Sequence, residues 1–509
     1  MKKKLLKNTF YNYLYRIWIL IVAFCLFPFI VHHLGPAAAG VWLLVNSFVG
    51  YVATLSLGIG PSLTKYVAQF QTENNKEKLN QSISTSVVIF IVMGFIAFFA
   101  FFIVGRFIIP LFNIPEELID EAKIITNIVA ATMFVSFPMG TFTGVLRGLQ
   151  RYDIFSLTGF AASILRIILT VFFLSRGYGV VTLILINSVS SLFGWLLNAY
   201  YAKKLLPFMR ISFSLVDKEM RKTLLSLAIP IFIINICMTI IYPTDKLIIG
   251  FFLPVGFIVF YEAAYRIYKL LVTFPQLLAS AVIPVASELD TMRNCKSLKN
   301  LFMKGTKYMS AFFLALAVPV MLSSKLLLYY WMGEEFAQYY YLVVIFTLHL
   351  FFNYNHLFSY YILVGMNKIR FTLWYYVGSA VLNLILSFIL IQKIGLVGVV
   401  LGTTISYVVL EPIFFWYNLK VFDVSLREYL KRVLSKIYPQ VLIVALPLCL
   451  LLRYYSPRNL IEVAILIILS SAAYLILFYF SGVEKQEQKD FQSLIIAGRQ
   501  YIRNKLRVE

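Results

Sequence analysis

The chain has 509 residues, of which 61% are hydrophobic and only 13% are charged. This charged fraction is about half that of an ordinary globular protein, so too few polar side chains remain to cover a soluble protein of this size. The net charge of +22 would suggest nucleic acid in a soluble chain, but basic loops beside a membrane explain it better. We therefore expect an all-α polytopic membrane protein with no nucleic-acid partner.

The N-terminal segment has features of a secretory signal. Lys2–Lys4 precede an apolar run over 17–31, and three alanines follow at 37–39. Against cleavage, Arg16 interrupts the approach to the run and apolar character resumes at Val41. We expect this segment to be retained as the first membrane span.

Fourteen apolar blocks follow one another, each of about 20 residues, the length that crosses a hydrocarbon core about 30 Å thick. They cover residues 11–33, 39–61, 83–110, 122–146, 154–175, 178–201, 223–252, 257–286, 306–330, 337–364, 371–391, 396–419, 437–455 and 459–481. An even number places both termini on one side, where the loops hold 33 Lys and Arg against 7 on the other side. This asymmetry predicts cytoplasmic termini.

A sequence repeat joins the two halves of the chain. Residues 148–151 (GLQR) and 365–368 (GMNK) each connect two blocks and lie 217 residues apart. The repeat predicts two parallel six-helix bundles, a transporter architecture with the pathway between the halves. We expect bundles at 1–201 and 223–420, a basic cytoplasmic linker at 202–222, two additional spans within 421–481, and a cytoplasmic tail at 482–509. The tail either forms an amphipathic helix on the membrane surface or is a solvated charged segment.

Cations within spans are candidate ligands for a substrate, because an ionisable group in the membrane costs about 2.5–3.5 kcal/mol by insertion scales. The candidates for substrate binding are Arg16, Arg166, Arg266, Lys269 and Asn383, the last because it occupies the repeat position of Arg166. Two structural alternatives stay open. Arg16 lies near a membrane surface to which it can snorkel, and Arg266 follows Glu262 by one helical turn and can neutralise it.

Three acidic residues within spans are candidates for ion coupling: Glu411, Asp245 and Glu262. Glu411 precedes Pro412, which frees a backbone carbonyl, so it is the preferred titratable group. With Lys246 there are five cations within spans against three acids, which predicts a basic pathway that suits an anionic, phosphate-bearing substrate. The four cysteines and four histidines form no metal-binding pattern, so neither a metal nor a cofactor is expected.

Several motifs resemble one family. They are Leu34-Gly35 with Gly40-Val41-Trp42, the segment 57–68 (LGIGPSLTKYVA), the segment 244–250 (TDKLIIG), and Arg147-Gly148 with Asp153. Together with the span layout they resemble bacterial polysaccharide flippases of the multidrug/oligosaccharidyl-lipid/polysaccharide exporter superfamily. The resemblance implies two six-helix bundles that alternate in opening, and an oligosaccharide on a polyprenyl pyrophosphate as cargo. It also implies that Arg16, Arg166, Arg266 and Lys269 hold the pyrophosphate.

The resemblance further implies the bacterial cytoplasmic membrane, with membrane lipids and a polysaccharide polymerase or glycosyltransferases as partners of a monomer. One departure is the lack of a dense acidic cluster in the N-terminal half, which puts ion coupling there in doubt. Two alternatives remain: a small-molecule exporter of the same fold, and a membrane-embedded polymerase or glycosyltransferase. The longest loops have roughly 20 residues and are basic, without the paired carboxylates of acid–base catalysis, so we do not expect an enzyme.

Overall fold

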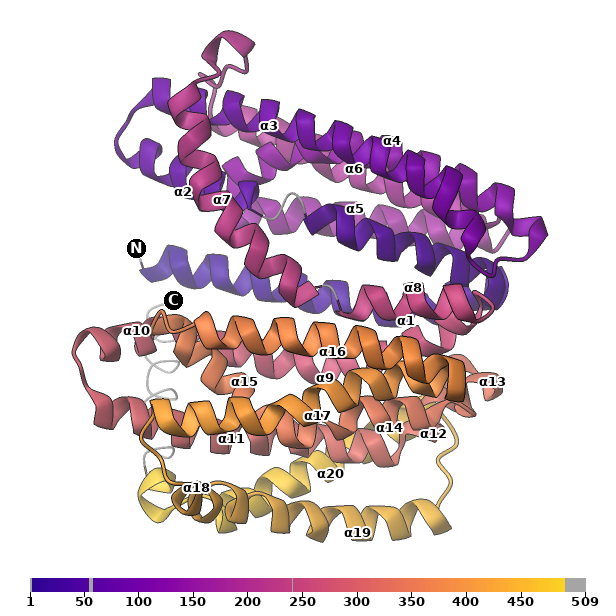
Figure 1. Cartoon of the computed structure of the whole chain (residues 1–509), viewed down its shortest axis with the longest axis vertical. Helices are drawn as coiled ribbons and strands as arrows, with labels where there is room; N and C mark the ends of the chain where they lie inside the picture. The colour runs from indigo at the N-terminus through magenta and orange to yellow at the C-terminus, as the bar shows by residue number, and fades with distance from the viewer. Residues whose placement is uncertain (1, 55–57, 240, 490–509) are drawn as a thin grey trace, which may run out of the picture. The chain divides into compact units, whose positions relative to one another are not determined.

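The computed structural model describes residues 2–54, 58–239 and 241–489, and throughout these ranges regular secondary structure is helical (Figure 1). Within them, eleven helical stretches are long and apolar enough to cross a membrane. This confirms an all-α, multi-pass membrane protein, because only helices and closed barrels satisfy every backbone polar group in lipid. Side chains such as Phe99 and Phe107 project outward from their helices, as expected for a lipid-facing surface.

The first helix, α1 (Lys2–Thr54), contains two of the predicted blocks. Gly35 interrupts it with non-helical angles (φ 74°, ψ 163°), which glycine adopts without steric cost. The rings of Phe27 and Trp42 lie 6.5 Å apart, whereas 15 residues of straight helix would separate them by about 22 Å. The chain therefore reverses at Gly35, and the blocks 11–33 and 39–61 belong to separate arms.

Two other predicted blocks coincide with interrupted helices. Block 223–252 is divided between α7 (Lys218–Thr239) and α8 (Ile241–Phe252), and block 337–364 between α14 (Tyr340–Leu348) and α15 (Leu350–Gly365). Neither is among the eleven stretches, so the count of fourteen spans stays a prediction.

The chain divides into two compact units. Unit 1 comprises residues 1–262 and 380–403, and unit 2 comprises 263–379 and 404–509. Three helices contribute to both units: α9 (Phe257–Ser280), α16 (Arg370–Ile394) and α17 (Leu396–Val421). The domain boundaries expected from the repeat stay a prediction, since these units follow packing rather than repeat order.

Unit 1 packs its remaining helices around α4 (Glu116–Gly148). The others are α2 (Ile59–Thr72), α3 (Lys76–Ile103), α5 (Tyr152–Leu174) and α6 (Val180–Leu205), together with α1, α7 and α8. Helices α3 and α6 both run alongside α4 (Figure 1). Leu63, Leu79, Leu146 and Leu224 from α2, α3, α4 and α7 join in one buried apolar cluster.

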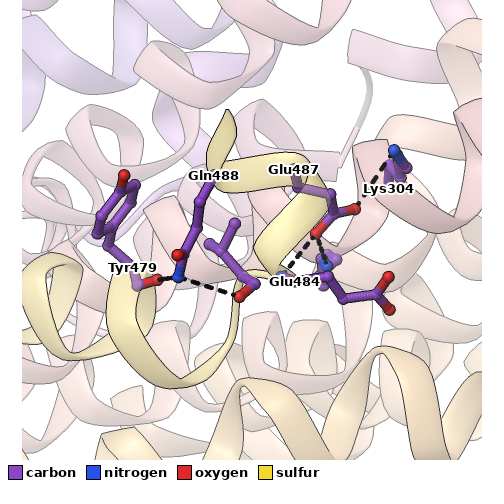
Figure 2. Close-up of polar contacts among 7 residues, drawn as sticks. Lys304, Tyr479, Glu484, Glu487 and Gln488 are labelled. Atoms are coloured by element: carbon purple, nitrogen blue, oxygen red, sulfur yellow. Dashed lines mark hydrogen bonds and ion pairs between the residues drawn. The ribbon is translucent and has the colours of Figure 1, made fainter. Parts of the chain in front are cut away.

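Unit 2 is centred on α11 (Cys295–Leu322), which contacts both α19 (Tyr438–Tyr454) and α20 (Leu460–Ser481). The shorter helices are α10 (Ile283–Thr291), α12 (Ser324–Met332), α13 (Glu334–Ala337) and α18 (Leu426–Arg432). After α20 the chain returns to α11, where Glu487 pairs with Lys304 at 3.5 Å and Lys307 at 2.6 Å (Figure 2). The predicted interfacial helix beyond residue 489 lies outside the described residues.

The turns carry the internal repeat predicted from the sequence. Gln150 and Asn367, 217 residues apart, both have φ of 56°. Asn75 and Asn294, 219 residues apart, cap α3 and α11 by accepting a hydrogen bond from the backbone N–H three residues later. The backbone geometry at these turns and caps therefore matches between the two halves, as the repeat predicts, and the division into two six-helix bundles stays a prediction.

Candidate functional site

A polar cavity of about 250 Å³ opens within unit 1. Helices α1, α4, α5 and α6 contribute its lining, which includes Tyr15, Thr143, Thr158, Gly159, Ser163, Arg166, Ser190, Ser191, Trp195 and Asn198. The α5 members recur at intervals of three or four residues and so share one helix face. We call this space the Arg166 cavity.

Hydrogen bonds between helices fix the wall of the Arg166 cavity. Thr158 donates to Asn198 Oδ1 at 2.7 Å, and Asn198 Nδ2 donates to Thr143 Oγ1 at 3.3 Å, which joins α5, α6 and α4. Gly159 lets α1 approach, because a Cβ at this position would lie 2.3 Å from the Tyr15 ring. The wall is therefore a connected network with little freedom to collapse.

The charge of the Arg166 cavity is positive. Arg166 is its ionised side chain, and none of the described lining residues carries a carboxylate. Tyr15 interacts electrostatically with both Arg166 and Arg147, and Arg147 in turn interacts with the exposed Arg16. The group around Tyr15 thus includes Arg166 and Arg147 directly, and Arg16 through Arg147. Arg147 was not among the predicted ligands, although it adjoins the repeated turn, which was the available signal.

A second polar cluster in unit 1 surrounds Asp245, whose side chain is fully buried. Tyr261 and Thr403 each donate to Asp245 Oδ2 at 2.8 Å, and Asn383 Nδ2 lies 3.4 Å from Oδ1. Asn383 also reaches Thr403 Oγ1 at 2.9 Å and Ser387 Oγ at 3.2 Å. We call this set, from α8, α9, α16 and α17, the Asp245 cluster.

The Asp245 cluster presents oxygen atoms and no described cationic partner. The Asp245 carboxylate, the three hydroxyls and the Val399 carbonyl are hard ligands of the kind that small cations prefer. The Val399 oxygen lies 3.3 Å from Ser387 Oγ. The amide of Asn383 can supply a further oxygen, since the assignment of its O and N rests on the hydrogen-bond network. The arrangement can therefore hold a proton or a dehydrated cation.

The other predicted residues are distributed between the two units. Glu262 on α9 pairs with Lys246 on α8 at 2.6 Å in unit 1. A lysine from another helix therefore balances its charge, in addition to any neighbour on α9. Arg266 is half-buried and Lys269 is exposed, both in unit 2. Glu411, also in unit 2, is buried and accepts a hydrogen bond from Tyr375 at 3.2 Å.

The structure therefore brings together some predicted residues and separates others. Asn383, expected to bind substrate, lies in the Asp245 cluster with an exposed fraction of 1%. Arg166 and Arg16 share the tyrosine-centred group of unit 1. Asp245 and Glu411, both expected to couple an ion, belong to different units. The sequence pattern gave no indication of Tyr261 or Thr403 as partners of Asp245.

Comparisons with known proteins agree with this architecture. A family model described as polysaccharide biosynthesis protein matches residues 5–290, and no curated protein matches the chain. The lipid II flippase MurJ in an inward closed conformation is 18% identical, with 93% of this chain and 98% of that chain covered and a TM-score of 0.73. An inward-facing multidrug resistance MATE family transporter of the MOP superfamily is also 18% identical, with 82% and 94% covered and a TM-score of 0.68.

A third similar structure is an MOP superfamily transporter from Pyrococcus furiosus Vc1, for which a reverse polarity of the binding pocket suggests a different function. It is 18% identical, with 82% of this chain and 93% of that chain covered and a TM-score of 0.57. At these identities the likeness shows a shared fold: the chain has the architecture of MOP transporters and flippases.

Proposed function

The chain belongs to the polysaccharide biosynthesis protein family, and from this premise we propose that it is a lipid-linked oligosaccharide flippase. Its cargo would be an oligosaccharide on a polyprenyl pyrophosphate, moved from the cytoplasmic to the outer leaflet of a bacterial cytoplasmic membrane by alternating access. Both termini would lie in the cytoplasm, consistent with the basic loops on that side.

The observation that carries the proposal is the Arg166 cavity. A guanidinium binds phosphate oxygens through paired, charge-assisted hydrogen bonds, and these strengthen where water is limited. Arg166 lines the cavity together with neutral hydroxyl and amide groups. Arg16 and Arg147 add positive charge to the same group of side chains. Such a site favours a pyrophosphate over a cationic drug.

A transport assay with purified protein tests this proposal. In proteoliposomes carrying a fluorescent polyprenyl-pyrophosphate oligosaccharide, Arg166→Gln should lower lipid translocation about 10- to 100-fold, the value of one or two charged hydrogen bonds. Lys269→Gln in unit 2 should also reduce it. Arg176→Gln is the matched control, because Arg176 is exposed and stacks on Phe172 at 3.9 Å. Equal rates for Arg166→Gln and Arg176→Gln would rule out the assigned role of Arg166.

A small-molecule exporter is the second candidate, favoured by the similarity to a multidrug resistance MATE family transporter. The two functions predict different substrates in the same vesicles. A drug exporter would extrude a fluorescent cation such as ethidium and ignore the pyrophosphate lipid. The flippase would do the reverse, because an arginine-lined cavity repels a cation.

We also infer that the Asp245 cluster couples transport to a cation or a proton. Intramembrane carboxylates commonly mark ion pathways, and this one is surrounded by neutral oxygen-bearing groups on α9, α16 and α17. Glu411 is a weaker candidate, since it accepts a hydrogen bond from Tyr375 in an aromatic environment. Glu262 is weaker still, because it pairs with Lys246.

A thermal-shift measurement distinguishes between a cation and a proton. If the cluster binds sodium, NaCl should raise the melting temperature more than choline chloride at equal ionic strength, and Asp245→Asn should abolish the difference. If it binds a proton, translocation should instead depend on pH, and Asp245→Asn should remove that dependence. No effect of Asp245→Asn on either quantity would exclude the cluster from coupling.

A further inference from the structure

A strongly basic surface lies where α6 ends and α7 begins. Its exposed cations are Lys203, Lys204, Arg210, Lys218, Arg221 and Lys222, against two acidic residues, Asp217 and Glu219. The surface adjoins the end of α6, one of the helices long and apolar enough to cross the membrane. We call it the basic collar, and none of its residues contributes to the Arg166 cavity or the Asp245 cluster.

Hydrogen bonds to α3 hold the segment 206–217, which connects α6 to α7 within the basic collar. Arg210 donates its backbone N–H to Asn80 Oδ1 at 3.0 Å, and Ser212 N–H reaches Ser84 Oγ at 3.3 Å. Asp217 donates its backbone N–H to Thr85 Oγ1 at 3.3 Å. Its carboxylate caps the start of α7 by accepting a hydrogen bond from the Met220 N–H at 2.6 Å. The cations therefore lie on or beside a connection that α3 holds in place.

Helix α7 buries one face and leaves the opposite face open. Met220, Leu224 and Ala228 follow four-residue steps into the core of unit 1. An open groove of about 690 Å³ runs along the other face, lined by Lys218, Glu219, Arg221, Lys222, Leu225, Ser226 and Ile229. The groove thus changes from charged to apolar within about 16 Å of helix, given a rise of 1.5 Å per residue.

Apolar side chains beside the cations add a membrane-facing element. Phe213 is 79% exposed and Ile211 is 46% exposed, on the same connection that α3 holds in place. A free phenylalanine tip next to lysines and arginines suits the headgroup boundary of a bilayer, where an apolar ring can insert below anionic phosphates.

We propose that the basic collar binds an anionic phospholipid, with the phosphate on the cations of α7 and an acyl chain along Leu225 and Ile229. The change from charge to apolar surface along one groove matches the headgroup and upper chain of a lipid, and α6, which is long and apolar enough to cross a membrane, ends beside it. Basic clusters next to a span attract anionic lipids by several-fold for each charge. This inference goes beyond the proposed cargo and does not depend on it.

Native mass spectrometry of the full chain in detergent tests the proposal, with phosphatidylglycerol and phosphatidylcholine of identical acyl chains as probes. The wild type should retain phosphatidylglycerol preferentially. The double variant Arg221→Gln with Lys222→Gln should bind it more weakly, about 5-fold for each charge removed, with phosphatidylcholine unaffected. The matched control is Lys296→Gln with Lys431→Gln, which removes two exposed cations from unit 2 and should keep the preference.

Three results would overturn the proposal: equal retention of the two lipids by the wild type, an unchanged preference in the double variant, or complete displacement of the lipid by millimolar inorganic phosphate. The last would indicate a site for the free ion. Because the mutated side chains are exposed, the lipid-free melting temperature should stay within about 1 °C of wild type. If the double variant fails to fold, Lys218→Gln serves as the single-site test. Phe213→Ser should weaken both lipids together.

Discussion

The Arg166 cavity and the Asp245 cluster lie in the same unit but treat a buried charge in opposite ways. Arg166 lines an open space of about 250 Å³ and keeps partial exposure. Asp245 is fully enclosed, and neighbouring side chains already occupy its hydrogen-bonding positions. A cation that faces an open cavity can exchange ligands without rearrangement of the fold. An enclosed anion instead stabilises the fold through its hydrogen bonds. We infer that the cavity binds the large cargo and the cluster a small ion.

The strongest test of this comparison removes each charge in turn. Asp245→Ala should destabilise the protein by about 3–5 kcal/mol, because the donors of Tyr261, Asn383 and Thr403 would lose their buried acceptor. Arg166→Ala should cost about 1 kcal/mol or less, since water can fill the cavity. Unfolding experiments in mixed micelles measure the loss of unfolding free energy in each variant. Equal losses would show that the two sites do not differ in rigidity.

Two glycines provide a second test, with a smaller effect. A Cβ at Gly402 would lie 2.4 Å from Ser387 Oγ and 2.7 Å from Ser387 N, so α17 would have to move away from α16. Gly402→Ala should therefore cost about 2–3 kcal/mol and disturb the Asp245 cluster. Gly159→Ala should cost less, because the tip of Tyr15 can swing into the cavity. Melting temperatures of the two variants, in the presence and absence of sodium, show whether Gly402→Ala loses more stability than Gly159→Ala.

Two hydroxyl groups give a finer comparison. Thr403 donates to the buried carboxylate, so Thr403→Val should cost about 1–2 kcal/mol. The Ser190 hydroxyl is buried in the cavity wall with no partner among the described residues, so Ser190→Ala should change stability by less than about 0.5 kcal/mol. Ser190→Ala should nevertheless weaken cargo binding if that hydroxyl contacts the pyrophosphate. A lipid-binding titration distinguishes this from a purely structural role.

A further comparison concerns Glu487, a buried carboxylate that, unlike Asp245, is paired with lysines. Burial opposes its ionisation, but hydrogen bonds from Lys307 and the Glu484 backbone outweigh this and lower the pKa of Glu487 below its ordinary value of 4.5. Its stabilising contribution is therefore complete above that value and is lost as the pH falls through the lowered pKa. The stability difference between wild type and Glu487→Gln should be constant from pH 8 to 5 and shrink below pH 4. A difference that grows on acidification would contradict this pairing.

Much of the fold was predictable because membrane insertion is a local constraint. Each span must be apolar over about 20 residues, so the blocks can be read without knowing what they contact. The break predicted between blocks 11–33 and 39–61 falls at Gly35, where α1 reverses. The same logic failed at His349, which separates α14 from α15 inside block 337–364, because hydropathy shows one continuous run there. The repeated turns at Gln150 and Asn367 were visible in the sequence because their backbone conformation restricts the residues that fit.

The sequence by itself determined the all-α membrane class, and it showed the internal repeat and the rare charges within the apolar blocks. Each of these follows from composition or from contacts within a turn or a helix. Only the tertiary structure decided the partners: Asn383 joins Asp245 across 138 residues, Glu262 pairs with Lys246 from another helix, and Arg147 approaches Tyr15. The physical reason is that helical periodicity shows which side chains share a face, while only packing decides which faces meet.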